Sequence, residues 1–303
     1  MTKPALMIGL GEVLWDILPS GRVLGGAPAN FAYMTSVLGD EGIVASRVGN
    51  DELGLEARRV MQRLGLNTSY LQQDNEHETG TAIVSIDAAG QPNFTIKESV
   101  AWDFLERTEP WEKLSSRADV ICFGSLAQRS ANSAVTIECF LRNAPERALR
   151  IFDVNLRQSF YTKDVLRKSF KQAHIVKLNE QELLQISFLL RLGIGSEEIL
   201  ARRLLKECQL RLVCITRGAR GSLLVSEEQT VEHRGYRVTV ADAVGAGDAF
   251  TACLAHHYLH GQPLEEISES ANRFASWVAT QTGATPPINT GQLQDILSGV
   301  ALR

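Results

Sequence analysis

The segment from Asp242 to Phe250 carries residue types and a spacing that suit the transfer of a phosphoryl group. It reads Asp-Ala-Val-Gly-Ala-Gly-Asp-Ala-Phe and lies between a strand-like run at 236–240 and a run of apolar residues at helical spacing. Glycines at a helix start let backbone N–H groups converge where the helix dipole is positive, which suits an anion. Asp248 falls in the first helical turn, where it could take the proton of a hydroxyl that attacks a phosphate.

The same segment has a simpler interpretation, because glycines and an aspartate at a helix start also occur as ordinary capping. It is not a dinucleotide-binding fingerprint, since Phe250 stands where the third glycine belongs. No Gly-x-x-x-x-Gly-Lys-Ser/Thr motif occurs in the chain, which excludes a P-loop kinase.

A second group of residues could bind hydroxyl groups. Gly25 and Gly26 precede a predicted helix, and Asn30 in its first turns offers both a hydrogen-bond donor and an acceptor. Asp16 stands in a strand-like run beside Trp15, where a carboxylate could accept from sugar hydroxyls and the indole could cover a sugar ring. The alternatives are an ordinary strand-to-helix turn and a carboxylate exposed on an edge hairpin.

Polar clusters also follow several strand-like runs. The run Asn179–Glu182 fits either a helix capping box or a site for water-bridged Mg²⁺. Arg157, which follows the run 150–154, could hold a substrate anion or form a surface ion pair. The segment Thr216–Gly221 is either a hairpin turn or a glycine turn over which a nucleotide can lie.

The elements that must position these residues predict an α/β fold. Apolar runs at 5–10, 43–48, 120–124, 150–154, 174–178 and 212–216 alternate with helical patterns, which is typical of a mostly parallel sheet covered on both faces. Two stretches predict hairpins instead, with turns at Pro19–Arg22 and Ala88–Gln91. Hairpins lack a helical crossover, so we expect a small separate sheet. Residues 1–303 are predicted to form a single domain with lid hairpins inserted at about 13–25 and 81–98.

Composition excludes several function classes. The 303 residues are 44% hydrophobic and 22% charged, and the net charge of −4 without a basic run argues against nucleic acid or an anionic membrane as a partner. Five scattered cysteines without a Cys-x-x-Cys pair, and no signal peptide, predict a cytoplasmic protein with reduced thiols. His256, His257 and His260 share a predicted helix but lack further zinc ligands.

Five motifs occur in order along the chain and together resemble the ribokinase-like carbohydrate kinases, also called the phosphofructokinase-B type. The motifs are Gly25-Gly26-x-x-Ala29-Asn30, Gly49-Asn50-Asp51-x-x-Gly54, Asn179-x-x-Glu182, Thr216-x-Gly218-x-x-Gly221 and Asp242-x-x-Gly245-Ala246-Gly247-Asp248. The resemblance covers about residues 5 to 288. It implies a three-layer α/β/α fold with a small β-sheet lid, and phosphorylation of a sugar hydroxyl with ATP and Mg²⁺. In one departure, Ala243 stands where the family usually has threonine.

Roles for individual residues follow from the matching positions. The resemblance implies that Asp248 is the general base and that the backbone amides of Gly245, Ala246 and Gly247 form an anion hole. It implies that the sugar ligands are Asp16, Gly26 and Asn30 and that Glu182 holds Mg²⁺ through water. The nucleotide ligands implied are Asn179, Thr216, Gly218, Gly221 and Asn272. A site for a monovalent cation such as K⁺ is implied at Asp242, Val244, Ala279 and Gly283.

Within this family, the runs 11–19 and 25–32 most resemble bacterial fructokinases. Ala27 and Pro28 stand where ribokinases and sugar-phosphate kinases typically carry Lys-Gly, so a neutral sugar, D-fructose, is the expected acceptor. 2-Keto-3-deoxygluconate is the alternative, because Arg129 or Arg157 could bind its carboxylate. A sugar-binding regulatory protein without chemistry is a further class, against which the retained Asp248 counts. We also expect the lid hairpins to support a homodimer.

Overall fold

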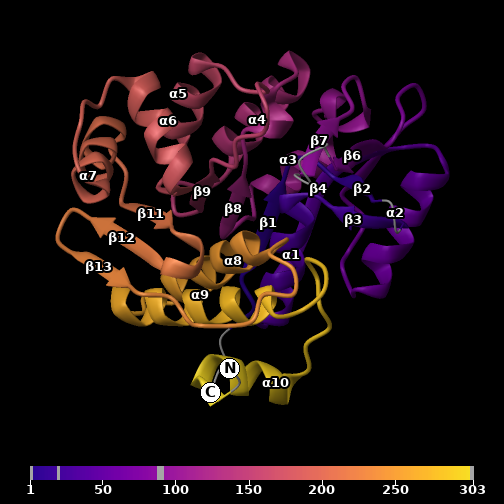
Figure 1. Cartoon of the computed structure of the whole chain (residues 1–303). Helices are drawn as coiled ribbons and strands as arrows, with labels where there is room; N and C mark the ends of the chain where they lie inside the picture. Colours follow the sequence, from indigo (N-terminus) through magenta and orange to yellow (C-terminus); the bar gives the residue numbers. More distant parts are fainter. Residues whose placement is uncertain (1–2, 19–20, 87–91, 301–303) are drawn as a thin grey trace.

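A nine-stranded sheet organises the residues that the structure describes, which are 3–18, 21–86 and 92–300 of this computed structural model. Its strand order is β13-β12-β11-β10-β9-β8-β1-β4-β5, parallel from β11 to β5 and antiparallel at β12 and β13 (Figure 1). The strands are β1 Leu6–Leu10, β4 Glu41–Gly49, β5 Leu71–Asp74, β8 Val120–Phe123, β9 Leu149–Asp153, β10 Ile175–Asn179, β11 Leu212–Thr216, β12 Ser222–Ser226 and β13 Thr230–His233. The predicted, mostly parallel α/β architecture is therefore confirmed.

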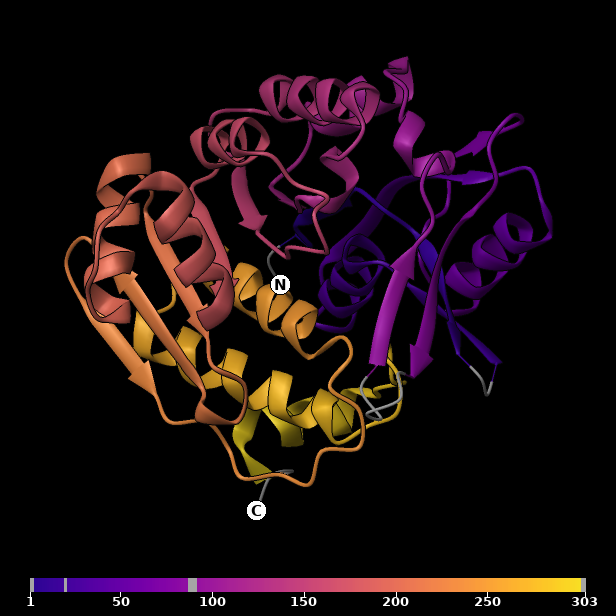
Figure 2. The same ribbon diagram turned by 45° about the horizontal axis from the view of Figure 1, so that its top comes forward.

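Helices cover both faces of this sheet. One buried apolar cluster packs α3 to α7 on one face, and a second packs α1, α2 and α8 to α10 on the other. Figures 1 and 2 show α8 and α9 lying together on the second face. The helices are α1 Ala27–Val37, α2 Glu52–Arg63, α3 Glu109–Ser115, α4 Ala131–Asn143, α5 Lys163–Gln172, α6 Glu180–Leu190, α7 Glu197–Cys208, α8 Ala246–Leu259, α9 Leu264–Ala279 and α10 Thr290–Ser298, with short 3₁₀ turns η1 Ala101–Phe104, η2 Leu126–Gln128 and η3 Gly218–Arg220.

The near-continuous apolar character of the central strands reflects this double cover. In β1, Ile8 belongs to one cluster and its neighbour Met7 to the other, and both side chains are fully buried. A strand with one face in water would alternate apolar with polar residues. The continuous apolar runs in the sequence therefore predict that helices cover both faces of the sheet.

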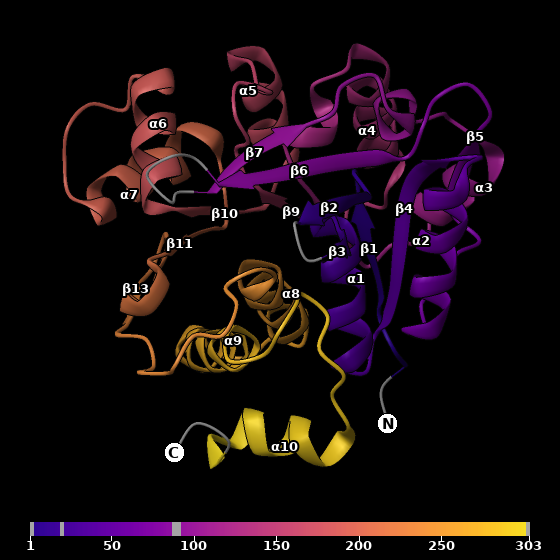
Figure 3. The same ribbon diagram turned by 45° about the vertical axis from the view of Figure 1, so that its right-hand side comes forward.

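The two predicted hairpins form one smaller sheet with the order β3-β2-β6-β7. Its strands are β2 Leu14–Leu18, β3 Gly21–Gly25, β6 Gly80–Ile86 and β7 Pro92–Ile96, and β2 pairs with β6 in parallel. Figure 3 shows β6 and β7 running side by side, apart from the strands of the large sheet. Residues 19–20 of the first predicted turn and all of the second, residues 88–91, lie outside the described residues.

The motif Gly49-Asn50-Asp51-x-x-Gly54 ties this smaller sheet to the body. The Asp51 carboxylate caps α2 by accepting from the Gly54 N–H, and it also accepts from the backbone N–H and the hydroxyl of Thr79, each at 2.7 Å. Thr79 immediately precedes β6. A Cβ on Gly49 would lie 2.5 Å from the Asp51 carboxylate, and one on Gly54 would lie 2.1 Å from the Gly49 carbonyl oxygen. The glycines thus make room for a carboxylate that anchors the base of the small sheet.

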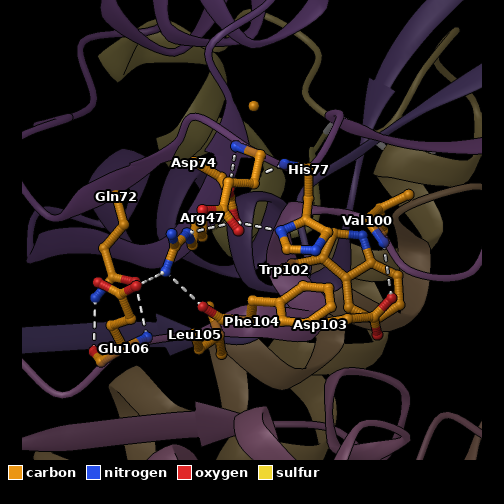
Figure 4. Close-up of polar contacts among 12 residues, drawn as sticks. Arg47, Gln72, Asp74, His77, Val100, Trp102, Asp103, Phe104, Leu105 and Glu106 are labelled. Carbon is orange, nitrogen blue, oxygen red and sulfur yellow. Dashed lines mark hydrogen bonds and ion pairs between the residues drawn. The ribbon is translucent and has the colours of Figure 1, made fainter.

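A second set of polar contacts holds the same base (Figure 4). The buried Asp74 carboxylate forms an ion pair with Arg47 at 2.9 Å and accepts from the His77 backbone N–H at 2.9 Å. The His77 ring stacks on Phe104 with centroids 3.5 Å apart, and Arg47 donates to the Phe104 carbonyl at 2.6 Å. Residues 74–79 therefore connect β5 to β6 through a segment that is fixed at several points.

One predicted element is wrong. The run Tyr236–Val240 forms no strand, because β13 ends at His233 and the following residues lie along α9. The Tyr236 hydroxyl donates to Glu269 and accepts from Arg273 at 3.2 Å, and both partners belong to α9. Side-chain contacts to a helix replace strand pairing here, and an alternating apolar pattern cannot distinguish the two.

Candidate active site

The helix α8 presents an uncapped N-terminus with a carboxylate in its first turn. Gly245, the N-cap residue, has φ 81°, and no side chain caps the helix. The Ala246 N–H makes a long bond of 3.3 Å to the Ala243 carbonyl, and no side chain competes with an anion for the N–H groups at this helix start. A Cβ on Gly245 would lie 2.6 Å from the Ala284 Cα, so this position requires glycine on two grounds. Asp248 lies in the first turn, as predicted.

Two motifs from opposite ends of the chain meet at Asp248. Asn30, in α1, donates from Nδ2 to Asp248 Oδ2 at 2.7 Å across 218 positions of sequence. The helices α1 and α8 pack against each other on the same face of the sheet, and this packing brings the two residues together. The geometry holds the Asp248 carboxylate in one orientation while its second oxygen stays free of this bond.

The surroundings make Asp248 a stronger base than an ordinary carboxylate. Burial raises the pKa of Asp248 to about 6, and the nearby Asp153 carboxylate adds to the increase. The hydrogen bond from Asn30 and the charges of Lys177 and Arg157 act in the opposite direction. A carboxyl group with a pKa near neutrality can accept a proton and release it again under neutral conditions.

Of the other predicted hydroxyl ligands, Asp16 shares the neighbouring charge of Arg157 with Asp248. Asp16 is half-buried in β2; burial raises the pKa of Asp16, and Arg157 counteracts that effect. Its carboxylate lies against Gly25, where a Cβ would come within 2.5 Å of Oδ2. Gly26 has φ 113°, and a Cβ there would lie 2.5 Å from the Glu12 carbonyl oxygen. Position 26 therefore requires glycine, and a side chain at position 25 would displace the Asp16 carboxylate.

The Trp15 side chain does not lie beside the Asp16 carboxylate, where the sequence pattern predicts it. Its indole N–H donates to the Leu53 carbonyl at 3.0 Å, and the side chain is buried among residues that include α1 and α2. Alternation along β2 places Trp15 and Asp16 on opposite faces of the strand. The expectation that this indole covers a sugar ring is wrong.

The two arginines proposed as anion ligands differ in their surroundings. Arg157 is exposed in the loop after β9, and its charge lowers the pKa of Glu12, Asp16 and Asp248. Arg129 is instead buried in a bidentate ion pair with Asp103, with bonds of 2.7 and 2.8 Å. Its guanidinium is also stacked between aromatic rings and donates to a backbone carbonyl, and only Nη1 lacks a partner within the described part of the chain. The structure therefore favours Arg157 over Arg129 as a substrate ligand.

The predicted nucleotide-side residues cluster at the carboxyl ends of β10 and β11. Asn179 and Glu182 form a reciprocal capping box at the start of α6, and Glu182 also accepts from the Leu156 N–H at 2.8 Å. Burial raises the pKa of Glu182, whereas the neighbouring Lys177 lowers it. The capping interpretation is thus confirmed, and the same carboxylate keeps lone pairs that could accept from metal-bound water.

The glycines of the segment Thr216–Gly221 close a turn between antiparallel strands β11 and β12. Gly218 and Gly221 have φ 56° and 80°, and a Cβ on Gly221 would lie 2.1 Å from the His233 carbonyl oxygen. Asn272 is buried in α9, where its amide donates to the Ser222 hydroxyl at 2.7 Å and ties the helix to β12. This part of the site therefore consists of a tight backbone turn backed by a buried amide.

The residues proposed for a monovalent cation lie together beside α8. Asp242 accepts from the Val244 N–H at 3.0 Å and from the Gly283 N–H at 3.2 Å, and its own N–H donates to the Ala279 carbonyl at 3.2 Å. These oxygens and turns fit a hard cation held by carboxylate and carbonyl groups. Among the described residues, no group of three or more His, Cys, Asp or Glu side chains could hold a metal ion. In the same part of the chain, no helix is long and apolar enough to cross a membrane.

Comparisons with known proteins agree with this geometry. Residues 21–291 match the family described as pfkB family carbohydrate kinase. The chain belongs to this family. Fructokinase of Escherichia coli is 32% identical over 257 residues, with 81% of each chain covered. Fructokinase of Vibrio alginolyticus is 28% identical over 297 residues, with 92% of this chain and 94% of the relative covered.

A solved relative shares the whole fold of this carbohydrate kinase. A double-mutant fructokinase from Vibrio cholerae, crystallised with fructose, ADP and potassium ion, superimposes with a TM-score of 0.82 at 24% identity. The match covers 98% of this chain and 99% of that one. The likeness establishes the ribokinase-like architecture of this chain.

Two buried charged side chains of this carbohydrate kinase are not among the residues predicted from the sequence. Glu12 lies between β1 and β2 with 3% of its surface exposed, and its Oε2 has no hydrogen-bond partner in the described residues. Burial raises the pKa of Glu12 to about 7, and Asp248 contributes to the increase. Lys177 is buried in β10 beside Asp153. The available signal was a charged residue within each apolar run, Gly9–Trp15 for Glu12 and Ile175–Leu178 for Lys177.

Proposed function

We propose that this kinase transfers the γ-phosphoryl group of ATP to a hydroxyl of a neutral sugar, D-fructose. The observation that carries the proposal is the hydrogen bond from Asn30 to Asp248 at the uncapped start of α8. It links a hydroxyl-binding motif to a base and an anion hole, and phosphoryl transfer needs all three within reach of each other. A helix start that served only as structure would need neither the amide nor a base with a raised pKa.

In the proposed mechanism the acceptor hydroxyl donates to the free oxygen of Asp248. As the oxygen attacks phosphorus, its O–H bond breaks and the proton passes to Asp248. ATP would supply the phosphoryl group: the bond between its γ-phosphorus and the β,γ-bridging oxygen breaks as the new bond forms, and ADP leaves with that oxygen. The N–H groups of Gly245, Ala246 and Gly247 would neutralise the negative charge on that group as it moves, because no side chain caps them.

Further residues would hold the bound groups that the reaction needs. Asn179, Thr216, Gly218, Gly221 and Asn272 would form the nucleotide site. Glu182 would hold Mg²⁺ through water, since its buried carboxylate retains lone pairs beside the capping bonds. Asp242 with the carbonyls around Val244 and the segment 279–283 would hold K⁺, in agreement with the potassium-bound fructokinase from Vibrio cholerae.

The charges of the proposed acceptor site favour a neutral sugar. The carboxyl groups of Glu12, Asp16 and Asp248 all interact with Arg157, so one cation faces three acidic groups. An anionic acceptor would compete with these carboxylates for the same guanidinium. 2-Keto-3-deoxygluconate remains the second candidate, because Arg157 is exposed. The relatives named fructokinase support D-fructose.

The small sheet would close over the sugar as a lid and pair with a second copy of the chain. Val23 and Ile83, both of this sheet, are exposed by 41% and 53%. An apolar surface on an open sheet favours burial against a partner. We propose accordingly that the kinase is a cytoplasmic homodimer and that residues 1–303 work as one domain with this lid inserted.

A coupled assay of ADP release tests the function. D-Fructose, D-ribose, 2-keto-3-deoxygluconate, fructose 6-phosphate and adenosine are compared by kcat/KM, with sugar-independent ATP hydrolysis as the blank. We expect D-fructose to give the highest value. A higher value for 2-keto-3-deoxygluconate or for the sugar phosphate would refute the acceptor assignment. Tight sugar binding without any turnover would support the regulatory class instead.

A further inference from the structure

A buried lysine lies directly behind the anion hole. Lys177 is 8% exposed, and its Nζ would lie only 3.0 Å from a Cβ on Gly247. Gly247 lies in the first turn of α8, beside Asp248. The ammonium group is therefore packed against the backbone that would receive the phosphoryl group.

The lysine is held by a fully paired acidic partner. Nζ donates to both carboxylate oxygens of Asp153 at 3.1 Å each, and Asp153 is 4% exposed. The Thr251 hydroxyl, one turn after Gly247 in α8, donates to the same carboxylate at 3.0 Å. Three elements, β9, β10 and α8, are thus joined at one buried ion pair below the helix start.

A buried ion pair of this kind contributes little to stability by itself. Removing two charges from water costs free energy that their attraction only partly offsets, so well-packed apolar residues often serve as well. Its position against the anion hole suggests an electrostatic use instead. Without the lysine, the two carboxylates Asp153 and Asp248 would lie under the hole with no buried cation between them.

We propose that Lys177 is a positioning residue for phosphoryl transfer, which holds Gly247 from behind and balances Asp153 so that Asp248 can ionise. This inference rests on the proposed role of Asp248 as the base. The groups that face Asp248 are Asn30 from α1, Glu12 from the turn before β2, Cys122 from β8, Asp153 from β9, Arg157 from the loop after β9, and Lys177 from β10. Lys177 and Asp153 act on its pKa in opposite directions.

Because Lys177 and Asp153 have opposite effects on the pKa of Asp248, their variants should shift the pH profile in opposite directions, which a purely structural role of Lys177 does not predict. The pH dependence of kcat/KM for the acceptor sugar is measured between pH 5 and 9 for Lys177→Met, Asp153→Asn and the double variant. We expect the acidic limb of Lys177→Met to move up by about 1 pH unit, with about a fivefold loss at pH 6 beyond any loss at pH 9. The limb of Asp153→Asn should move down, and that of the double variant should return toward the wild-type position.

The design separates instability from electrostatics. Lys177→Met leaves a buried carboxylate unpaired, which is destabilising. If that variant does not fold, the effect of the lysine is measured between Asp153→Asn and the double variant. Lys171→Met, which removes an exposed lysine of α5, is the matched control and should leave the limb unchanged.

Two results would overturn the inference. The first is an acidic limb of the pH profile that does not move between the wild type and Lys177→Met, nor between Asp153→Asn and the double variant. The second is an acidic limb that moves in the same direction for Lys177→Met and Asp153→Asn. Either would make the lysine a packing residue only. Failure of the proposed function has a different signature, because the wild-type enzyme would then show no sugar-dependent ADP release, or Asp248→Asn would keep its activity.

Discussion

Replacing Asp248 by asparagine should make the enzyme inactive and more stable at the same time. The substitution keeps the size of the side chain and an oxygen that can accept from Asn30, but it removes the basic carboxylate. We expect kcat to fall by at least about 10²-fold, the usual contribution of a positioned proton transfer. Sugar binding should persist, because a base contributes mainly in the transition state.

The expected gain in stability follows from the raised pKa. The ordinary pKa of 3.8 and the folded value of about 6 differ by an amount equivalent to about 3 kcal/mol. Because the folded pKa is the higher one, the ionised carboxylate destabilises the folded state increasingly as the pH rises from about 4 to 6, and fully above that range. Asparagine avoids this cost but weakens the bond to Asn30, so a net gain on the order of 2 kcal/mol is expected at pH 8.

Urea unfolding and steady-state kinetics of the same preparations test both parts. The free energy of unfolding is compared between Asp248→Asn and the wild type at pH 8 and pH 5, and the advantage of the variant should shrink to roughly a third at pH 5. The exposed Glu227→Gln serves as the control and should change neither quantity. If Asp248→Asn is no more stable than the wild type at pH 8, the claim that the ionised Asp248 carboxylate destabilises the folded state is refuted. A near-normal kcat would refute the role of Asp248 as the base.

Three further predictions follow from the proposed site. Asp16→Ala should lower kcat/KM for D-fructose by about 30- to 1,000-fold, equivalent to about 2–4 kcal/mol, because sugar hydroxyls lose their acceptor; an unchanged value would remove Asp16 from the site. Activity should be higher in KCl than in an equal concentration of a tetraalkylammonium salt, and equal rates would argue against a cation beside Asp242. Sedimentation at micromolar protein should give a dimer that Ile83→Lys dissociates, since this side chain of the small sheet is 53% exposed; a monomeric wild type would contradict the proposed pairing.

Most of the fold could be predicted because apolar periodicity reports burial directly. The strands Val120–Phe123 and Leu212–Thr216 are buried on both faces, so all their residues except the terminal Thr216 are apolar and the runs are unambiguous. The run Tyr236–Val240 instead alternates apolar with polar residues, as a strand with one exposed face would, but it lies beside the helix α9. Local sequence could not predict that outcome, because hydrogen bonds to Glu269 and Arg273 decide it.

The site was predictable where backbone geometry required a residue type. Gly26 and Gly245 have positive φ and no space for a Cβ, so they stand out in the sequence as glycines before helices. Glu12 and Lys177 could not be assigned in the same way, since a lone charge in an apolar run indicates burial but not its partner. The prediction that Trp15 covers a sugar ring was wrong for a related reason, because the sequence does not show which face of β2 packs against the helices.

The distribution of charge around Asp248 explains why such a site depends on cations and amides. Burial and the neighbouring Asp153 carboxylate raise the pKa of Asp248, which makes Asp248 basic enough to take a proton. The same negative charge would repel the phosphoryl group that must approach the acceptor. Lys177 offsets the charge of Asp153, and the N–H groups at the start of α8 would face the phosphoryl group in the proposed site. The proposed base and anion hole would be compatible because compensating charges are held in the backbone, in the buried Lys177 and in Arg157.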